Sequence, residues 1–311
     1  MGSGVVVLVA VLIALVFALA WAIHSRASAR TSLTGGHPTL TAAVRFERRR
    51  ALASLTLTLV LLTASVVAGL HETHLLGLPL ILAPAVAGTG GLLLYAATPL
   101  PSLPLEPDST RTARLERRRP WSFLSTRARI GLAALSILAI SLFVTTGATS
   151  SPDHLGRFRT ITFSRAMASS SSGPYPGWYY TVPLLIATAL FIGAALLALH
   201  RLASTPSLHG PDLAEADLQW RRASTSILTA LIAAVLCLEL GGIAFLAGLT
   251  MRSAAEGMQA PFASTIAAPG LLTLGAITLV VSLVWFLLAV RRAVDLSRTV
   301  GARTSRPLPH A

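Results

Sequence analysis

Seven stretches of about 20 predominantly apolar residues run through this chain, and they limit its possible folds more than any other feature. Only helices and closed barrels satisfy every backbone hydrogen bond inside a bilayer, and runs of this length are typical of helices. The stretches are residues 4–23, 52–70, 75–98, 130–149, 182–200, 227–249 and 266–290. The sequence therefore predicts an all-α integral membrane protein, a bundle of seven transmembrane helices that forms one domain over residues 1–290.

The arginines lie mainly on one side of the predicted membrane segments. All 25 basic residues are Arg, and if the N-terminus is outside, 21 of them fall in inside segments and 4 in outside loops. Positive charge concentrates on the cytoplasmic side of such proteins. We therefore expect a multi-pass plasma-membrane protein with an extracytoplasmic N-terminus and a cytoplasmic C-terminus. Residues 291–311 are then a basic cytoplasmic tail, predicted to be disordered.

The same charge distribution bears on the partners of the chain. A net charge of +13 would favour nucleic acid in a soluble protein, but this chain is 53% hydrophobic and only 12% charged. Arginines beside a membrane are instead attracted to anionic lipid. We therefore expect the lipid bilayer, with anionic lipid at the inner face, as the main partner and no nucleic acid. Other membrane subunits are a further option.

The first apolar stretch and the longest outside loop each need an interpretation of their own. Residues 4–23 have the length of a signal peptide but lack its basic start, so they are predicted to stay as an anchor. Residues 150–181 form the extracytoplasmic loop. Within this loop, 157–165 has β-strand character and the serines at 169–172 suggest a flexible run. The aromatic residues at 174–180 fit either an interfacial belt or a ligand platform.

A weak internal similarity suggests how the helices are ordered. Residues 45–50 and 114–119 share the pattern R-[FL]-E-R-R-R, and each precedes a stretch that runs outward. One helix followed by three similarly oriented hairpins would explain this, an arrangement related to the parallel repeats of some transporters. Chance similarity between Leu- and Ala-rich helices, each preceded by topology-determining arginines, explains the same observation. Both interpretations stay open.

The stretch at 227–249 has two faces of different character. Its small residues recur at spacings of four and three and so share one stripe: Ala230, Ala234, Cys237, Gly241, Ala244 and Gly248. Such a stripe lets another helix approach closely in lipid. Glu239 lies on the opposite face, where a carboxylate in hydrocarbon would cost at least about 2.5 kcal/mol. We therefore expect protein on both sides, which predicts that this helix is the centre of the bundle.

Glu239 is the only formally charged side chain inside any of the predicted spans. Carboxyl groups at such positions tend to mark proton or substrate pathways. Thr278 lies at a similar depth in the antiparallel last stretch, and we expect its hydroxyl to hydrogen-bond Glu239. Two roles stay open for this polar core: a transport site, or a structural hydrogen bond that holds two helices together.

A second candidate site lies in the short outside turn between the second and third stretches. His71, Glu72 and His74 are one residue short of the zincin pattern, in which two histidines stand four positions apart. With Asp153 or His154 from the next outside loop they could hold a metal ion, or they are solvated turn residues. No other cofactor is predicted, because a P-loop, a G-x-G-x-x-G motif and a nucleophile elbow are all absent.

These observations favour a non-enzymatic function. The leading interpretation is a transporter-like protein or a membrane-complex subunit with a buried polar contact at Glu239. One alternative is an outer-face metal-handling protein or membrane enzyme that uses His71, Glu72 and His74. The other is an inert assembly or scaffold protein. No catalytic residue is predicted.

Overall fold

The computed structural model describes residues 38–98, 119, 121–165, 168–205, 214–256 and 262–304. Within these ranges the chain is almost entirely helical, and six helices are long and apolar enough to cross a membrane. They are α2 (Pro38–His71), α3 (Leu78–Ala97), α4 (Thr126–Ala148), α5 (Trp178–Ser204), α6 (Ala214–Glu256) and α7 (Phe262–Thr304). They correspond to six of the seven predicted spans, whereas the stretch at 4–23 lies outside the described residues.

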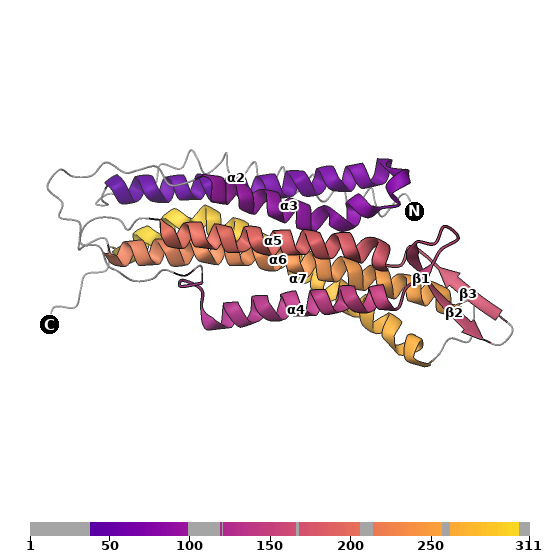
Figure 1. Ribbon diagram of the computed structural model, residues 1–311. Coiled ribbons are helices and arrows are strands. Elements are labelled where there is room, and N and C mark those ends of the chain that lie inside the picture. The colour runs from indigo at the N-terminus through magenta and orange to yellow at the C-terminus, as the bar shows by residue number, and fades with distance from the viewer. Residues whose placement is uncertain are drawn as a thin grey trace.

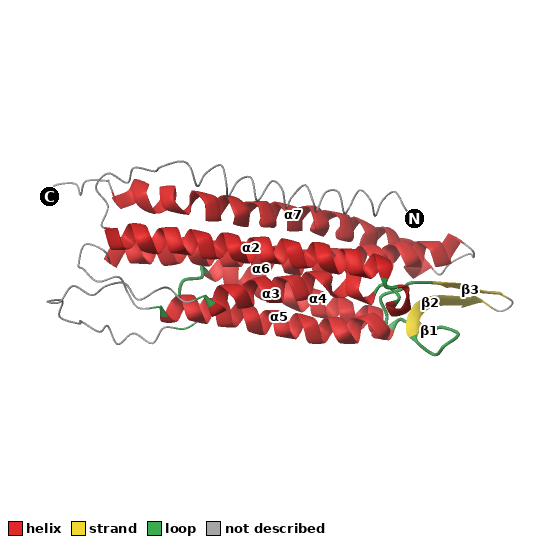
Figure 2. Ribbon diagram, turned by 90° about the horizontal axis from the view of Figure 1, so that it is seen from above, coloured by secondary structure: helices red, strands yellow, loops and turns green. Residues whose placement is uncertain are grey.

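The six helices lie side by side in an elongated bundle and alternate in direction along the chain (Figures 1 and 2). One end carries the strands β1 (Ser151–Pro152), β2 (Phe158–Arg165) and β3 (Ala168–Ser172), together with the 3-10 helix η1 (Thr73–Leu75). We call this the hairpin end. The other end holds the first turns of α2, α4 and α6 and the last turns of α3, α5 and α7. We call it the basic end, because the arginine runs of the described residues lie there.

Helix α6 is the centre of the bundle. It contacts each of the other five helices and the strands β2 and β3. In its most apolar 18-residue window 78% of the residues are buried, against 11–50% in the other five helices. This is the central position that the two opposed faces of the helix predict.

Three helices extend well beyond the apolar stretches that predicted them. Helix α2 has 34 residues, and α6 and α7 have 43 each. At the start of α6, Glu215 and Asp217 lie in the first turn, where carboxylates interact favourably with the positive end of the helix dipole. Helix α7 continues to Thr304, so part of the segment 291–311 that was predicted to be disordered is helical.

Helix α3 is continuous in spite of an internal proline and several glycines. The glycines allow close approach of neighbouring helices. A Cβ atom on Gly88 would lie 2.7 Å from the ring of Phe191 in α5 and 2.9 Å from Val235 in α6. At Gly91 the Ser54 hydroxyl of α2 donates to the main-chain oxygen at 2.7 Å. Helix α3 therefore packs tightly against three neighbours.

The sheet at the hairpin end is antiparallel, in the order β1-β2-β3. The strand predicted at 157–165 corresponds closely to β2. The serines at 169–172 were expected to be flexible but lie in β3, with Ser171 opposite Thr162. Main-chain hydrogen bonds to β2 order this run, and they are independent of the serine side chains.

Candidate functional site

Glu239 lies near the middle of α6, and only 2% of its surface is exposed. Next to it in α6, Leu240 and Ile243 belong to a buried apolar cluster. The other buried members are Ala85 of α3, Ala139 and Phe143 of α4, and Leu184 of α5. Three helices therefore enclose this face of α6. A carboxyl group in such surroundings is costly unless it is hydrogen-bonded.

Only one oxygen of the Glu239 carboxyl group has a partner. The hydroxyl of Thr188 in α5 donates to Oε2 at 2.9 Å. The other oxygen, Oε1, is buried without a hydrogen-bond partner among the described residues, and Glu239 forms no ion pair with any of them. Of the six such atoms among the described residues, Oε1 is the only carboxyl oxygen, and a buried polar atom without a partner calls for an explanation such as bound water or a functional role.

Thr278, which was expected to hydrogen-bond Glu239, lies on the other side of α6. Its hydroxyl donates to main-chain oxygens of its own helix, at 2.7 Å to Leu274 and 3.1 Å to Gly275. It packs against Gly241, where an added Cβ would come within 2.8 Å of Thr278 Oγ1. The expected contact was wrong because equal depth does not specify which face of α6 meets α7.

The small-residue stripe of α6 is the face that meets α7. All six members are buried: Ala230, Ala234, Cys237, Gly241, Ala244 and Gly248. A Cβ on Gly248 would lie 2.7 Å from the main-chain nitrogen of Leu272 and 2.8 Å from the main-chain oxygen of Ala268. The Ser282 hydroxyl of α7 donates to the main-chain oxygen of Ala234 at 2.7 Å. The stripe and Glu239 thus serve different contacts, with α7 on one side and α5 on the other.

A second buried polar cluster lies at the basic end, and sequence reasoning missed it. Glu47 and Arg50 of α2 are 0% and 5% exposed. The hydroxyl of Tyr95 in α3 donates to the Glu47 carboxylate, and Arg50 Nη1 lies 3.4 Å from Glu47 Oε2. Arg50 Nε donates to the Tyr95 main-chain oxygen at 2.8 Å, and its guanidinium lies 3.7 Å from the centre of the Tyr95 ring. These contacts join α2 to the last turn of α3.

Arg221 of α6 makes the corresponding contact with α5 and is 1% exposed. Its Nε and Nη2 donate to the two carboxylate oxygens of Asp217, at 2.8 and 3.2 Å. Its Nη1 and Nη2 donate to the main-chain oxygens of Leu202 and Thr205, both at 2.9 Å. The last carbonyl groups of a helix have no partner within the helix itself. Arg221 therefore caps the end of α5.

The sequence held an ambiguous signal for this cluster. Glu47 with Arg50, and Asp217 with Arg221, have the spacing of helical ion pairs, which contribute only a few tenths of a kcal/mol on an exposed face. The arginines were interpreted as a topology signal, and Arg49 is indeed exposed. Which arginine is buried depends on the neighbouring helix, which spacing along one helix does not reveal.

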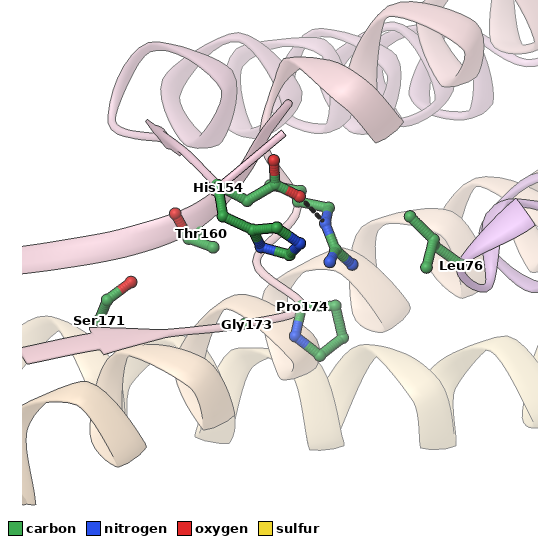
Figure 3. A pocket seen from close by; sticks show the side chains of 8 residues that line it. Leu76, His154, Thr160, Ser171, Gly173 and Pro174 are labelled. Atoms are coloured by element: carbon green, nitrogen blue, oxygen red, sulfur yellow. Dashed lines mark hydrogen bonds and ion pairs between the residues drawn. The ribbon is translucent and has the colours of Figure 1, made fainter. Parts of the chain in front are cut away.

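The histidine candidates lie at the hairpin end and do not form a ligand set. His71, Glu72 and His74 are exposed, and His71 Nδ1 lies 2.9 Å from the main-chain oxygen of Val67. His154 borders a hollow on the sheet (Figure 3). In the described part of the chain, no group of three or more His, Cys, Asp or Glu side chains is arranged to hold a metal ion.

The hollow at the hairpin end is open and has a volume of about 350 Å³. It is lined by Leu76, Asp153, His154, Arg159, Thr160, Ser171, Gly173 and Pro174 (Figure 3). Arg159 Nε contacts Asp153 Oδ2 at 2.5 Å and also interacts with the Tyr180 hydroxyl. Tyr180 in turn donates to the main-chain oxygen of Leu76 at 2.8 Å. These contacts tie the sheet to the ends of α3 and α5.

Two rings of the aromatic segment at 174–180 are buried. Tyr175 and Tyr180 are 2% and 0% exposed, and the Tyr175 hydroxyl lies 2.7 Å from Thr149 Oγ1. The Trp178 ring covers Gly147 of α4, where an added Cβ would approach it to 2.7 Å. Both predicted roles placed the rings at a surface, which is wrong for Tyr175 and Tyr180, whereas Trp178 and Tyr179 are partly exposed.

Acid is expected to loosen the turn around Asp153. The Arg159 side chain lowers the pKa of Asp153 from 3.8 to about 2. A depressed pKa means that the ionised form stabilises the folded loop, so this contribution is present above about pH 4 and is lost as the pH falls towards about 2. The amides of Leu155 and Arg157 both donate to Asp153 Oδ1, at 2.8 and 2.9 Å, so their hydrogen exchange, corrected for intrinsic rates, should accelerate in that window. The Asp153→Asn variant should lack this acceleration, and the same pH dependence in both proteins would contradict the prediction.

Comparison with models of known protein families, with curated proteins and with solved structures finds no significant match to this chain. The class of protein is therefore inferred from the fold alone. Six helices in the described part of the chain are long and apolar enough to span a membrane. The chain has the architecture of a multi-pass helical membrane protein.

Proposed function

We propose that this chain is a non-enzymatic, transporter-like membrane protein, working alone or as a subunit of a membrane complex, with Glu239 as its protonatable centre. One observation carries the proposal: the carboxyl group is buried in the central helix with one hydrogen bond and one unpaired oxygen. Buried groups that serve only structure are normally satisfied completely. An unpaired carboxyl oxygen is free to bind and release a proton.

The side chains around Glu239 favour proton transfer over covalent catalysis. The apolar cluster beside it takes Ala85, Ala139, Phe143 and Leu184 from α3, α4 and α5, and its hydrogen-bond partner is Thr188. Apolar groups supply neither an acid-base partner nor a nucleophile. They exclude water around the carboxyl group, which is the setting of a proton site inside a membrane.

The proposed orientation places the basic end in the cytoplasm of a plasma-membrane protein. Exposed arginines at that end include Arg45, Arg49, Arg127, Arg129 and Arg222. They would face anionic lipid and satisfy the positive-inside rule. The hairpin end would then lie outside the cell.

The Glu239→Gln variant tests the proposal, because it keeps the shape of the side chain and removes the titrating proton. Full-length protein is inserted into liposomes that contain a pH-sensitive dye, and a potassium gradient with valinomycin drives protons inward. We expect the wild-type protein to acidify the lumen faster than protein-free vesicles do. In the variant the protein-dependent rate should fall by about 100-fold or more, the usual cost of removing a proton-transfer group.

The matched control is Glu215→Gln. Glu215 is an exposed carboxylate of the same helix that accepts a hydrogen bond from Gln219 at 3.0 Å, and its replacement should leave the flux unchanged. Thermal unfolding in detergent establishes that both variants are folded. A wild-type flux no faster than that of empty vesicles, or an unchanged flux in Glu239→Gln, would refute the proposal.

A further inference from the structure

We infer that protons reach Glu239 from the hairpin end alone, along a row of hydroxyl groups on α5. The inference rests on the proposed function and specifies the access route of that site. The row consists of Thr181 and Thr188, and its inner end is the Thr188 hydroxyl that donates to Glu239.

The two threonines are placed in line by helix geometry. Seven positions correspond to about two turns, so Thr181 and Thr188 share one face of α5 and lie about 10 Å apart along its axis. They are 0% and 1% exposed. Because Thr188 contacts Glu239, this is the face of α5 that meets α6.

Both ends of this row carry an oxygen without a partner. Thr181 Oγ1 and Glu239 Oε1 are buried and make no hydrogen bond within the described residues. Buried polar groups in proteins are satisfied by ordered water when no protein group reaches them. A hydroxyl group or a water molecule can accept one hydrogen bond while it donates another. Leu184 is fully buried between the two threonines on the same face of α5. Water that passes beside its side chain would complete a chain in which each oxygen takes up one proton and releases one, ending on Glu239.

Helices α5 and α6 offer no such row in the opposite direction, and the buried hydroxyls of α2 on that side, Ser54 and Thr58, are already bonded to main-chain oxygens. The buried residues of α5 between Thr188 and the basic end are all apolar: Phe191, Ala194, Ala195, Ala198, Leu199, Leu202 and Ala203. In α6 the buried residues are apolar in both directions, from Ile227 to Leu236 and from Leu240 to Gly248, so the difference between the two ends lies in α5. The side chains of this apolar layer supply no oxygen atom that could bind a proton in transit.

The outer end of the row leads to the polar surface. Thr181 follows Tyr180, whose hydroxyl donates to the Leu76 main-chain oxygen and interacts with Arg159. Leu76 and Arg159 both line the open hollow in Figure 3. The hollow is therefore connected to Tyr180, the residue before Thr181, through the hydrogen bond from Tyr180 to Leu76.

No second titratable group competes with Glu239 on this face. Among the described residues, the ionisable side chains of α3, α4 and α5 lie near the helix ends: Tyr95 of α3, Arg127 and Arg129 of α4, and Tyr179, Tyr180, His200 and Arg201 of α5. Cys237 of α6 belongs to the stripe that faces α7. The protonation of Glu239 should therefore follow the pH on the hairpin side.

Silver ions test the route, because Ag⁺ is small and reacts with thiolates in water. In a Cys237→Ala background, single cysteines are introduced by Thr181→Cys, Thr188→Cys or Ala195→Cys. Ala195 is the matched control, since it is buried on the same face and as far from Thr188 as Thr181 is. Ag⁺ is added to one side of sealed, oriented vesicles, and the thiols left free are labelled with a maleimide after unfolding and measured by mass spectrometry.

We expect Ag⁺ from the hairpin side to block maleimide labelling of the cysteines at 181 and 188 at least about tenfold faster than labelling of the cysteine at 195. The reason is that an apolar layer strongly disfavours a cation. From the basic side all three should react slowly. In the flux assay Thr188→Val should slow proton uptake by about tenfold, the value of a hydrogen bond to a buried acid. Thr145→Val, which removes an exposed hydroxyl bonded to its own helix, should not slow it.

Equal protection at the three positions, faster reaction from the basic side, or normal flux in Thr188→Val would overturn the route. The proposed function would survive these results if Glu239→Gln still abolished proton uptake. Conversely, accessible cysteines together with normal flux in Glu239→Gln would leave a hydrated row without the proposed function.

Discussion

Replacing Arg221 by alanine is expected to lower the free energy of unfolding by about 3–5 kcal/mol, the cost of breaking a buried ion pair from one side. The change removes the ion pair between Arg221 and the Asp217 carboxylate. It also removes the donors to the main-chain oxygens of Leu202 and Thr205 at the end of α5. Equilibrium unfolding in mixed detergent and SDS micelles, followed by circular dichroism, measures the loss.

The neighbouring Arg222 is the control for this prediction, because the two variants have the same net charge. Arg222 is exposed, and Arg222→Ala should change the free energy of unfolding by no more than about 0.5 kcal/mol. If these arginines acted only as a topology signal, the two variants would have equal stability. Equal effects would therefore contradict the capping role of Arg221.

Adding one methyl group at Gly248 is expected to cost about 1–3 kcal/mol. The new Cβ of Gly248→Ala would lie 2.7 Å from the main-chain nitrogen of Leu272 and 2.8 Å from the main-chain oxygen of Ala268. Backbone atoms cannot rotate away as a side chain can, so α6 and α7 must separate. The same unfolding assay measures the effect, and a decrease in thermal stability should accompany it.

Gly242 provides the matched control on the same helix. A Cβ there meets nothing within 4 Å, so Gly242→Ala should be neutral or stabilise the helix by up to about 1 kcal/mol, the propensity difference between the two residues. Opposite signs for the two substitutions would establish close α6–α7 contact through the small-residue stripe. A neutral Gly248→Ala would contradict it.

Most of the helical architecture could be predicted because its signals are local. The length and apolar character of each stretch predicted the six membrane-length helices seen in the described residues. Periodicity within one helix placed Glu239 and the small residues on opposite faces, and both faces are buried. The stretch at 4–23 and the orientation in the membrane stay predictions.

The contacts of the candidate site were harder to predict, because each one joins residues far apart in the chain. Glu239 was expected to meet Thr278 and instead meets Thr188, since rotation about the axis of α6 determines which neighbour faces the carboxyl group. His71, Glu72, His74 and His154 were proposed as metal ligands only because they lie in two outside loops. Folding of the sheet placed His154 beside the hollow and left the other three at the exposed end of α2 and in the turn that follows.

The sequence by itself determined that this chain forms long apolar helices and that the stretch around Glu239 must be covered on two faces. Hydrophobic length and helical periodicity are properties of consecutive residues, so they need no knowledge of the rest of the molecule. Only the tertiary structure decided that Arg50 and Arg221 are buried and Arg49 and Arg222 are exposed. All four arginines have the same intrinsic chemistry, and their environments differ because separate helices pack against some of them and not others.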